Sequence, residues 1–253
     1  MKTEQRKVTR IAMWSGPRNI STALMRAWEN RSDTVVIDEP FYAYFLRRSG
    51  RQHPGREEVL AAQPADWRTV VERLQAPLPA GRAIHYQKQM THHLDESVSL
   101  DWLAGVRNCF LIRKPLNMLA SLLKVLPNAE LADTGLPQQL RLFEHVRSSQ
   151  TEIPPVIDTA DVLQHPGAML RALCAALDVP FSENMLRWPA GRRDSDGVWA
   201  PYWYAAVEKS TGFAPWRPAT PEIPPQKIAV LEQCQLLYDR IAEYRLQAIE
   251  GDS

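Results

Sequence analysis

The sequence has few cysteines and almost no net charge. Among its 253 residues are three cysteines, and 30 Lys and Arg stand against 29 Asp and Glu, for a formal net charge of +1. The three cysteines, Cys109, Cys174 and Cys234, are far apart and have apolar neighbours. This pattern predicts buried thiols of a reducing compartment and excludes a disulfide framework or a zinc site. The balanced charge gives no basis for a nucleic-acid-binding surface.

Long hydrophobic runs are also missing. No apolar stretch approaches the roughly 20 residues that a membrane helix needs. The first ten residues, MKTEQRKVTR, are polar and precede no apolar segment long enough for a signal peptide. We therefore expect a cytoplasmic protein without a membrane partner. Its hydrophobic content of 45% is sufficient for a large core, and its length predicts one α/β domain over residues 1–253.

Short apolar runs alternate with helical patterns along the chain, which indicates a mostly parallel sheet with helices on both faces. Polar residues 47–64 are expected to form a loop. Residues 181–225, rich in Trp, Pro, Arg and Gly, are long for a connection and are expected to be a functional loop region. The expected strands are 8–14, 34–37, 82–87, 108–112 and 155–158, and the expected helices are 20–30, 41–48, 67–74, 100–106, 116–125, 137–149, 169–177 and 228–246.

Ligands of such sheets bind at the carboxyl ends of the strands. That rule brings together residues 15–22, 38–40, 88–93 and 113–121. The first of these segments is a small-residue turn between a strand and a helix, an arrangement that suits a phosphate-like anion. Arg18 adds a cation, and Ser21 and Thr22 add hydroxyl donors. An ordinary turn with Ser21 as the helix N-cap is an equally open interpretation.

The turn has no Lys before Ser21. It therefore lacks the GxxxxGK[ST] pattern of ATP and GTP hydrolases.

A second motif follows a later strand. Arg113 ends the apolar run NCFLI, and Ser121 lies in the helix after it. A charge at the end of a buried strand needs a partner, either an anion or an ordinary salt bridge. Taken together, PRNIST and FLIRKPLNMLAS resemble the PRSGST-like and FLxRDPRxxxxS-like segments of the sulfotransferase superfamily. The resemblance extends over about residues 11–213.

The resemblance implies a three-layer, P-loop NTPase-like α/β fold and 3′-phosphoadenylyl sulfate (PAPS) as the sulfuryl donor, with no metal. It places Arg113 and Ser121 at the donor's 3′-phosphate. A third patch, RRDSDGVW, is similar to the family's late RKGxxGxW segment, although a solvated charge pair is the other interpretation. The resemblance thus implies three groups of donor ligands: Gly16, Pro17, Arg18, Asn19, Ser21 and Thr22 on the 5′ side, Arg113 and Ser121 on the 3′ side, and Arg192, Arg193 and Gly197 from the late segment.

The chain departs from the family pattern at several positions. Asn19 and Ile20 stand where Ser-Gly is usual, and a β-branched Ile does not readily adopt the positive φ that Gly permits. Lys114 and Leu116 replace the usual Asp and Arg. These departures leave open whether PAPS is the donor.

Sulfuryl transfer needs a base near the acceptor, by analogy with phosphoryl transfer. Glu39 is the first candidate, because Glu39-Pro40 resembles the EP motif of bacterial sulfotransferases, although Glu39 could instead cap a helix. His92 and His93 are the second candidates, and Lys88 would neutralise the bridging oxygen of the donor.

Aromatic residues after Glu39 and near Trp199 suit a small-molecule acceptor with a hydroxyl or an amine. Two alternatives stay open: a P-loop kinase-like phosphotransferase, and a non-catalytic nucleotide- or anion-binding protein. A homodimer is also open.

Overall fold

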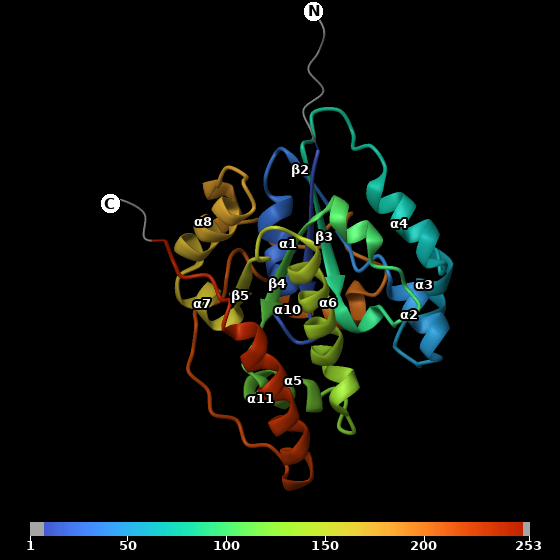
Figure 1. Cartoon of the computed structure of the whole chain (residues 1–253), viewed down its shortest axis with the longest axis vertical. Helices are drawn as coiled ribbons and strands as arrows, with labels where there is room; N and C mark the ends of the chain where they lie inside the picture. Colours follow the sequence, from blue (N-terminus) through green and yellow to red (C-terminus); the bar gives the residue numbers. More distant parts are fainter. Residues whose placement is uncertain (1–7, 250–253) are drawn as a thin grey trace, which may run out of the picture.

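The computed structural model describes residues 8–249, and a five-stranded sheet lies at its centre (Figure 1). The strand order is β2-β3-β1-β4-β5, and every neighbouring pair is parallel. Each expected strand is confirmed within three residues at either end. The strands are β1 (Thr9–Ser15), β2 (Thr34–Asp38), β3 (Ile84–Met90), β4 (Arg107–Ile112) and β5 (Val156–Asp158).

Helices cover both faces of the sheet, which confirms the α/β class (Figure 1). Alternate side chains of β1 enter different cores. Ile11 and Met13 pack in a cluster with α1 (Ser21–Glu29) and α8 (Pro166–Ala176), whereas Ala12 and Trp14 pack in a cluster with α6 (Leu136–Ser149) and α11 (Ile228–Ala242). The helices are α1 (Ser21–Glu29), α2 (Tyr42–Ser49), α3 (Arg56–Ala62), α4 (Trp67–Gln75), α5 (Pro115–Leu123), α6 (Leu136–Ser149), α7 (Thr159–Gln164), α8 (Pro166–Ala176), α9 (Ala200–Trp203), α10 (Ala205–Glu208) and α11 (Ile228–Ala242).

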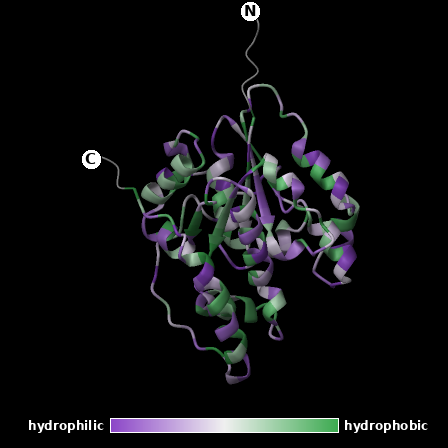
Figure 2. Ribbon diagram, in the orientation of Figure 1, coloured by the Kyte–Doolittle hydropathy of each residue, from purple (hydrophilic) through white to green (hydrophobic). Residues whose placement is uncertain are grey.

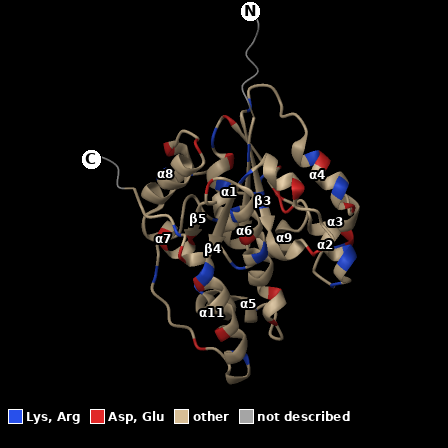
Figure 3. Cartoon of the chain, in the orientation of Figure 1, with Lys and Arg blue, Asp and Glu red and all other residues tan. Residues whose placement is uncertain are grey.

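Strand β3 is polar in sequence and buried in the sheet. Figure 2 shows it as a largely hydrophilic strand among its neighbours, yet all seven of its residues are buried. Lys88 is 1% exposed and Gln87 is fully buried. A charge at this depth requires partners, and they lie at the carboxyl end of the strand. On the outer helices, by contrast, acidic and basic residues are interspersed, as along α3 and α4 in Figure 3.

Two expectations about local structure were wrong, and one helix was missed. Residues 47–64 are not a loop throughout, because α2 continues to Ser49 and α3 occupies Arg56–Ala62. Two acidic residues in the first turn of α3 favour this helix, because negative charge is stabilised at a helix N-terminus. Val59 is buried and anchors the inner face of the helix. Helix α7 was not predicted. The last helix ends at Ala242, after which the N–H of Leu246 donates to the carbonyl of Val156 beside β5.

The region 181–225 contains the short helices α9 and α10. None of the described helices is long and apolar enough to cross a membrane.

Candidate active site

A cavity of about 1010 Å³ opens at the carboxyl ends of the strands. All four segments that the parallel-sheet rule brings together contribute to its wall. This position agrees with the general location of ligand sites in open α/β sheets. Of the candidate residues, the cavity is lined by Pro17, Arg18, Asn19, Ser21, Thr22, Glu39, Lys88, His92, His93, Arg113 and Ser121.

The turn between β1 and α1 has an unusual backbone at Arg18, not at Ile20. Arg18 has a φ of 59°, in the left-handed region, whereas Ile20 has φ −89° and ψ 23°. Ile20 therefore needs no glycine, and its side chain packs against the core. Ile20 is also the N-cap residue and makes no side-chain cap, so the interpretation of Ser21 as the N-cap is wrong.

Gly16 and Asn19 hold the turn in place. A Cβ on Gly16 would lie 2.6 Å from the carbonyl oxygen of Thr134, so only glycine fits this approach. The Asn19 amide donates to the carbonyls of Gly16 and Leu111, each at 3.4 Å. Its Oδ1 accepts a hydrogen bond of 3.2 Å from Thr159. These contacts fix the path of the turn against β4 and α7.

Arg18 and Arg113 are neighbours in the cavity wall, and Arg18 also contacts Ser121. The Nε of Arg18 donates to Oγ of Ser121 at 3.1 Å, and Arg113 donates to the carbonyl of Arg18. Burial lowers the pKa of Arg113, and the charge of Arg18 lowers it further. Within residues 8–249 neither arginine forms an ion pair with a carboxylate. Two adjacent cations without a carboxylate partner are suited to a polyanion.

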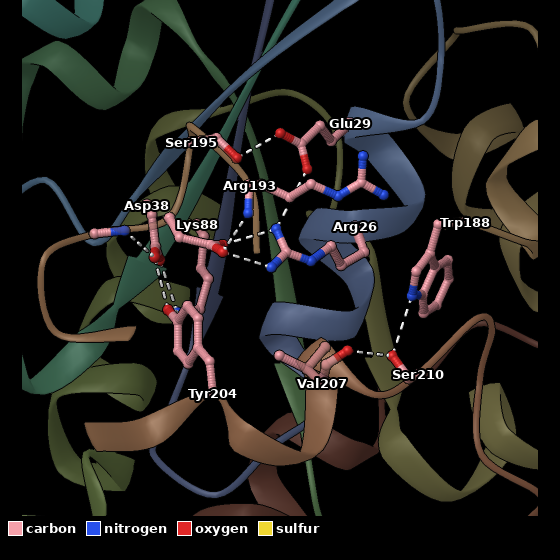
Figure 4. Close-up of polar contacts among 12 residues, drawn as sticks. Arg26, Glu29, Asp38, Lys88, Trp188, Arg193, Ser195, Tyr204, Val207 and Ser210 are labelled. Carbon is pink, nitrogen blue, oxygen red and sulfur yellow. Dashed lines mark hydrogen bonds and ion pairs between the residues drawn. The ribbon is translucent and has the colours of Figure 1, made fainter. Parts of the chain in front are cut away.

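Glu39 belongs to a buried cluster around Lys88. The Lys88 ammonium donates to Asp38 Oδ1 at 2.8 Å, to Glu39 Oε1 at 2.6 Å and to the Tyr204 hydroxyl at 2.7 Å. Tyr204 in turn donates to Asp38 Oδ2 at 2.7 Å (Figure 4). An ammonium has three protons, and all three have acceptors here. Lys88 therefore has no donor left for the bridging oxygen of a sulfuryl donor, contrary to the role that we expected for it.

Glu39 has the properties of a base. Burial raises the pKa of its carboxyl group, and the charge of Asp38 adds to this effect, whereas Lys88 opposes it. The second carboxylate oxygen of Glu39 lies 4.0 Å from His93 Nε2. Glu39 also has a φ of 39°, a strained value for this residue type. One oxygen is thus held by Lys88 while the other faces His93.

His92 and His93 are buried beside the cavity. Burial lowers the pKa of His92 to about 3 and lowers the pKa of His93 well below its ordinary value. The His93 ring stacks on Tyr42 at 4.8 Å and on Phe45 at 4.9 Å between centroids. Both imidazoles are therefore neutral near pH 7 and form an aromatic wall of low polarity.

The third patch does not reach the cavity. Arg192 is exposed, and the side chain of Arg193 donates to the carbonyl of Pro189 at 3.0 Å. Asp196, in the same segment, forms a bidentate pair with Arg26 of α1, with both contacts at 2.7 Å. A Cβ on Gly197 would lie 2.2 Å from the ring of Trp199. The segment 192–197 is thus packed on α1 and Trp199, and none of Arg192, Arg193 and Gly197 lines the cavity.

Sequence reasoning did not identify Asp38 and Tyr204 as members of a cluster around Lys88. The available signal was the pair of acids Asp38-Glu39 opposite a lysine in a strand that is otherwise part of the core. Because a buried lysine needs more than one acceptor, the pattern could have indicated a cluster. Tyr204 had no such signal, since it is 116 positions from Lys88 in the chain. No group of three or more His, Cys, Asp or Glu side chains in the described part of the chain is arranged to hold a metal ion.

The chain is 35% identical over 230 residues to branched-chain-amino-acid aminotransferase-like protein 2 of Arabidopsis thaliana, covering 90% of this chain and 40% of that protein. It therefore spans about two fifths of the length of the curated relatives that it matches.

Two solved structures share the fold. The sulfotransferase domain of the Synechococcus PCC 7002 olefin synthase has a TM-score of 0.57 at 15% identity and covers 98% of this chain and 99% of that one. A sulfotransferase from Alicyclobacillus acidocaldarius has a TM-score of 0.51 at 10% identity, with 94% and 97% covered. Residues 9–242 match the model of a protein family described as "Sulfotransferase domain". The chain therefore belongs to the sulfotransferase domain family.

Proposed function

We propose that this protein transfers a sulfuryl group from PAPS to a hydroxyl or an amine of a small-molecule acceptor. The observation that carries the proposal is the meeting of Arg18, Ser121 and Arg113 in the same cavity as Glu39. The reaction requires positively charged groups that bind the anionic donor and a carboxylate that accepts the proton of the acceptor. Family membership supports the reaction class.

The donor would lie over the first turn of α1. The N–H groups of this turn have no acceptor within the helix, and the helix dipole favours an anion at this end. Together with Arg18, Ser21 and Thr22 they would hold the 5′-phosphosulfate, while Arg113 and Ser121 would hold the 3′-phosphate. Gly16, Pro17 and Asn19 would shape the turn. The contacts of Arg193 and Gly197 favour a supporting role for these two residues over the phosphate contact that the resemblance implies, and Arg192 is exposed outside the cavity.

Glu39 is the proposed general base. The acceptor oxygen would attack the sulfur while its proton passes to the free oxygen of Glu39. The bond between sulfur and the 5′-phosphate oxygen breaks, which releases 3′-phosphoadenosine 5′-phosphate and the sulfated acceptor. Glu39 is favoured over His92 and His93 because burial raises the pKa of the carboxyl and lowers that of both imidazoles. The histidines are the weaker bases and would form part of the acceptor wall.

The acceptor end of the cavity favours a small, uncharged molecule. Tyr42 and Phe45 flank His93 with their ring faces. The two cations at its rim already have carboxylate partners, since Arg48 pairs with Asp95 at 2.9 Å and Arg51 pairs with Asp133 at 2.5 Å. A negatively charged acceptor would have to displace one of these acids.

The aminotransferase-like names of the curated relatives suggest a second reaction, which the site disfavours. An aminotransferase needs a lysine that can act as a nucleophile toward its cofactor. Burial alone would lower the pKa of Lys88, but Asp38 and Glu39 raise it well above its ordinary value. A lysine held protonated by two carboxylates is a poor nucleophile.

Calorimetry with 3′-phosphoadenosine 5′-phosphate and with ATP–Mg²⁺ separates the proposal from its alternatives. We expect micromolar binding of the former. Tight binding of ATP–Mg²⁺ alone would favour a kinase-like phosphotransferase. Binding without turnover of PAPS across a panel of phenols, alcohols and amines would favour a non-catalytic binding protein. The same preparation tests the homodimer by sedimentation, and fractionation of cells tests the cytoplasmic location.

A further inference from the structure

Resting on the proposed function, we propose that Asp38, Lys88 and Tyr204 are positioning residues for Glu39, which hold one oxygen of the base and direct the other to the acceptor. The four side chains come from β2 and its end, from β3 and from the junction of α9 and α10. Only Glu39, Lys88 and Tyr204 line the cavity, and Asp38 lies behind them.

The contacts form a closed ring beneath the base. Lys88 bridges Asp38 Oδ1 and the Tyr204 hydroxyl, and that hydroxyl donates to the other oxygen of Asp38. The side chains of Lys88 and Asp38 are each 1% exposed, and that of Glu39 is 13% exposed. Lys88 therefore stays in place whether or not Glu39 is charged. Because the ring is complete without Glu39, it can present a fixed donor to that carboxylate throughout a catalytic cycle.

The charge count explains why Asp38 matters. Two carboxylates share one ammonium in a buried site, which leaves one negative charge without its own partner. The Asp38 side chain is the more buried of the two and also accepts a hydrogen bond from Tyr204, so we assign the excess charge to Glu39. A carboxylate with a like charge nearby binds a proton more readily. Lys88, at 2.6 Å, opposes this effect. Among the described groups it is the one cation beside Glu39, because the other titratable neighbours of Glu39 are the neutral side chains of His93, Tyr42 and Tyr204.

The ring also anchors the neighbouring cavity wall. The indole of Trp199 donates to the Tyr204 hydroxyl at 3.2 Å, and the N–H of Gly197 donates to Asp38 Oδ2 at 3.3 Å. Residues Ala206, Val207 and Ser210, which follow Tyr204, line the cavity. The base and this wall are therefore fixed to the same carboxylate.

Carbon-13 NMR of protein labelled at glutamate side-chain carboxyls tests the inference without an acceptor. The Glu39 signal is identified by its loss in Glu39→Gln, and its titration is followed in the full chain. We expect Asp38→Asn to move the Glu39 midpoint down by about one pH unit or more, because the like charge is removed and Lys88 is released to Glu39. Lys88→Gln is expected to move the midpoint up. An unchanged midpoint in folded Asp38→Asn or Lys88→Gln would overturn the inference, and either variant alone decides it.

Steady-state kinetics supply the second measurement. The acid limb of the rate of sulfuryl transfer should shift with the NMR midpoint. Tyr204→Phe should lower kcat about tenfold, the loss expected for one hydrogen bond to a charged group, while the matched control Tyr202→Phe, which alters an exposed tyrosine two residues away, should leave kcat unchanged. Equal rates for these two variants would remove Tyr204 from the ring. If the unmodified protein transferred no sulfuryl group, the proposed function would fail, whereas the NMR midpoints would still decide the role of the ring.

Discussion

The Nε of Arg18 lies 3.1 Å from Oγ of Ser121, although 103 positions separate the two residues. Arg18 follows β1, Ser121 lies in α5 after β4, and β1 and β4 are paired directly in the sheet. Strand pairing therefore brings the proposed 5′ and 3′ phosphate ligands together, without a loop having to fold across the cavity. This shared edge has consequences for binding, catalysis and stability.

Removal of Arg113 should weaken donor binding. Arg113→Ala takes away a cation that has no carboxylate partner within residues 8–249 and that is the main proposed ligand of the 3′-phosphate. Hydrogen bonds to charged groups contribute about 1.5–3 kcal/mol, so the affinity for 3′-phosphoadenosine 5′-phosphate should fall about 10- to 100-fold. Calorimetry measures the change. Lys124→Ala, at an exposed position just after α5, is the matched control and should bind normally. An unchanged affinity in Arg113→Ala would exclude Arg113 from the donor site.

Glu39→Gln should abolish base catalysis and the acid limb of the pH profile. A base must be ionised to act, so the rate of the unmodified protein should rise with pH through the pKa of Glu39. Burial raises that pKa, which places the acid limb above the usual carboxyl range. The loss in kcat should be about 10²- to 10⁴-fold. Glu57→Gln, at a side chain that is 82% exposed, serves as the control. A normal rate in Glu39→Gln together with a slow His93→Gln would move the base to His93.

The sequence was sufficient to predict the sheet and the place of the cavity. Strands β1 and β4 are buried on both faces, so each appears in the sequence as a continuous apolar run, which is typical of a parallel sheet covered by helices. The ends of parallel strands meet at one edge, so the motifs after β1, β2, β3 and β4 had to be neighbours.

Features that depend on tertiary packing could not be predicted. Ile20 looked incompatible with the loop, but the positive φ is at Arg18, and no local pattern indicates this shift. The arginines at 192 and 193 were expected to be phosphate ligands because RRDSDGVW resembles the family's RKGxxGxW segment. The buried pair of Arg26 and Asp196 instead draws that segment onto α1. Lys88 was expected to neutralise the bridging oxygen of the donor, but its three protons already have acceptors in the protein.

The backbone of Arg18 should cost stability. A left-handed conformation costs a residue with a Cβ about 1–2 kcal/mol, a cost that glycine does not carry. Arg18→Gly should therefore be more stable than Arg18→Ala by about 1 kcal/mol, since both lose the same side chain. Urea denaturation gives the difference. At Arg147, in the exposed face of α6, the order should reverse, because glycine disfavours a helix by about 1 kcal/mol relative to alanine. Equal stability of the two Arg18 variants would mean that the turn relaxes in the free protein.

The pair of Arg26 and Asp196 should be the most sensitive ion pair of the described chain. Its side chains are 1% and 0% exposed, and both contacts are 2.7 Å. Asp196→Ala leaves a buried guanidinium with only Glu29 nearby, at 3.4 Å. Loss of one partner of a buried pair costs about 3–5 kcal/mol in the free energy of unfolding, whereas an exposed pair contributes about 0–1 kcal/mol. Glu144→Ala, which breaks the exposed pair with Arg240, is therefore the control.

A second variant separates charge from packing at the same position. Arg26→Met combined with Asp196→Leu removes both charges and keeps apolar volume, so it should recover most of the stability that Asp196→Ala loses. Because the segment 192–197 precedes Trp199 and Tyr204, a displaced segment should also release the ring beneath Glu39. Asp196→Ala should then lower kcat as well as stability, and the double variant should restore both. A double variant that is stable but slow would show that the charge pair itself, beyond its packing, holds the segment in register with the base.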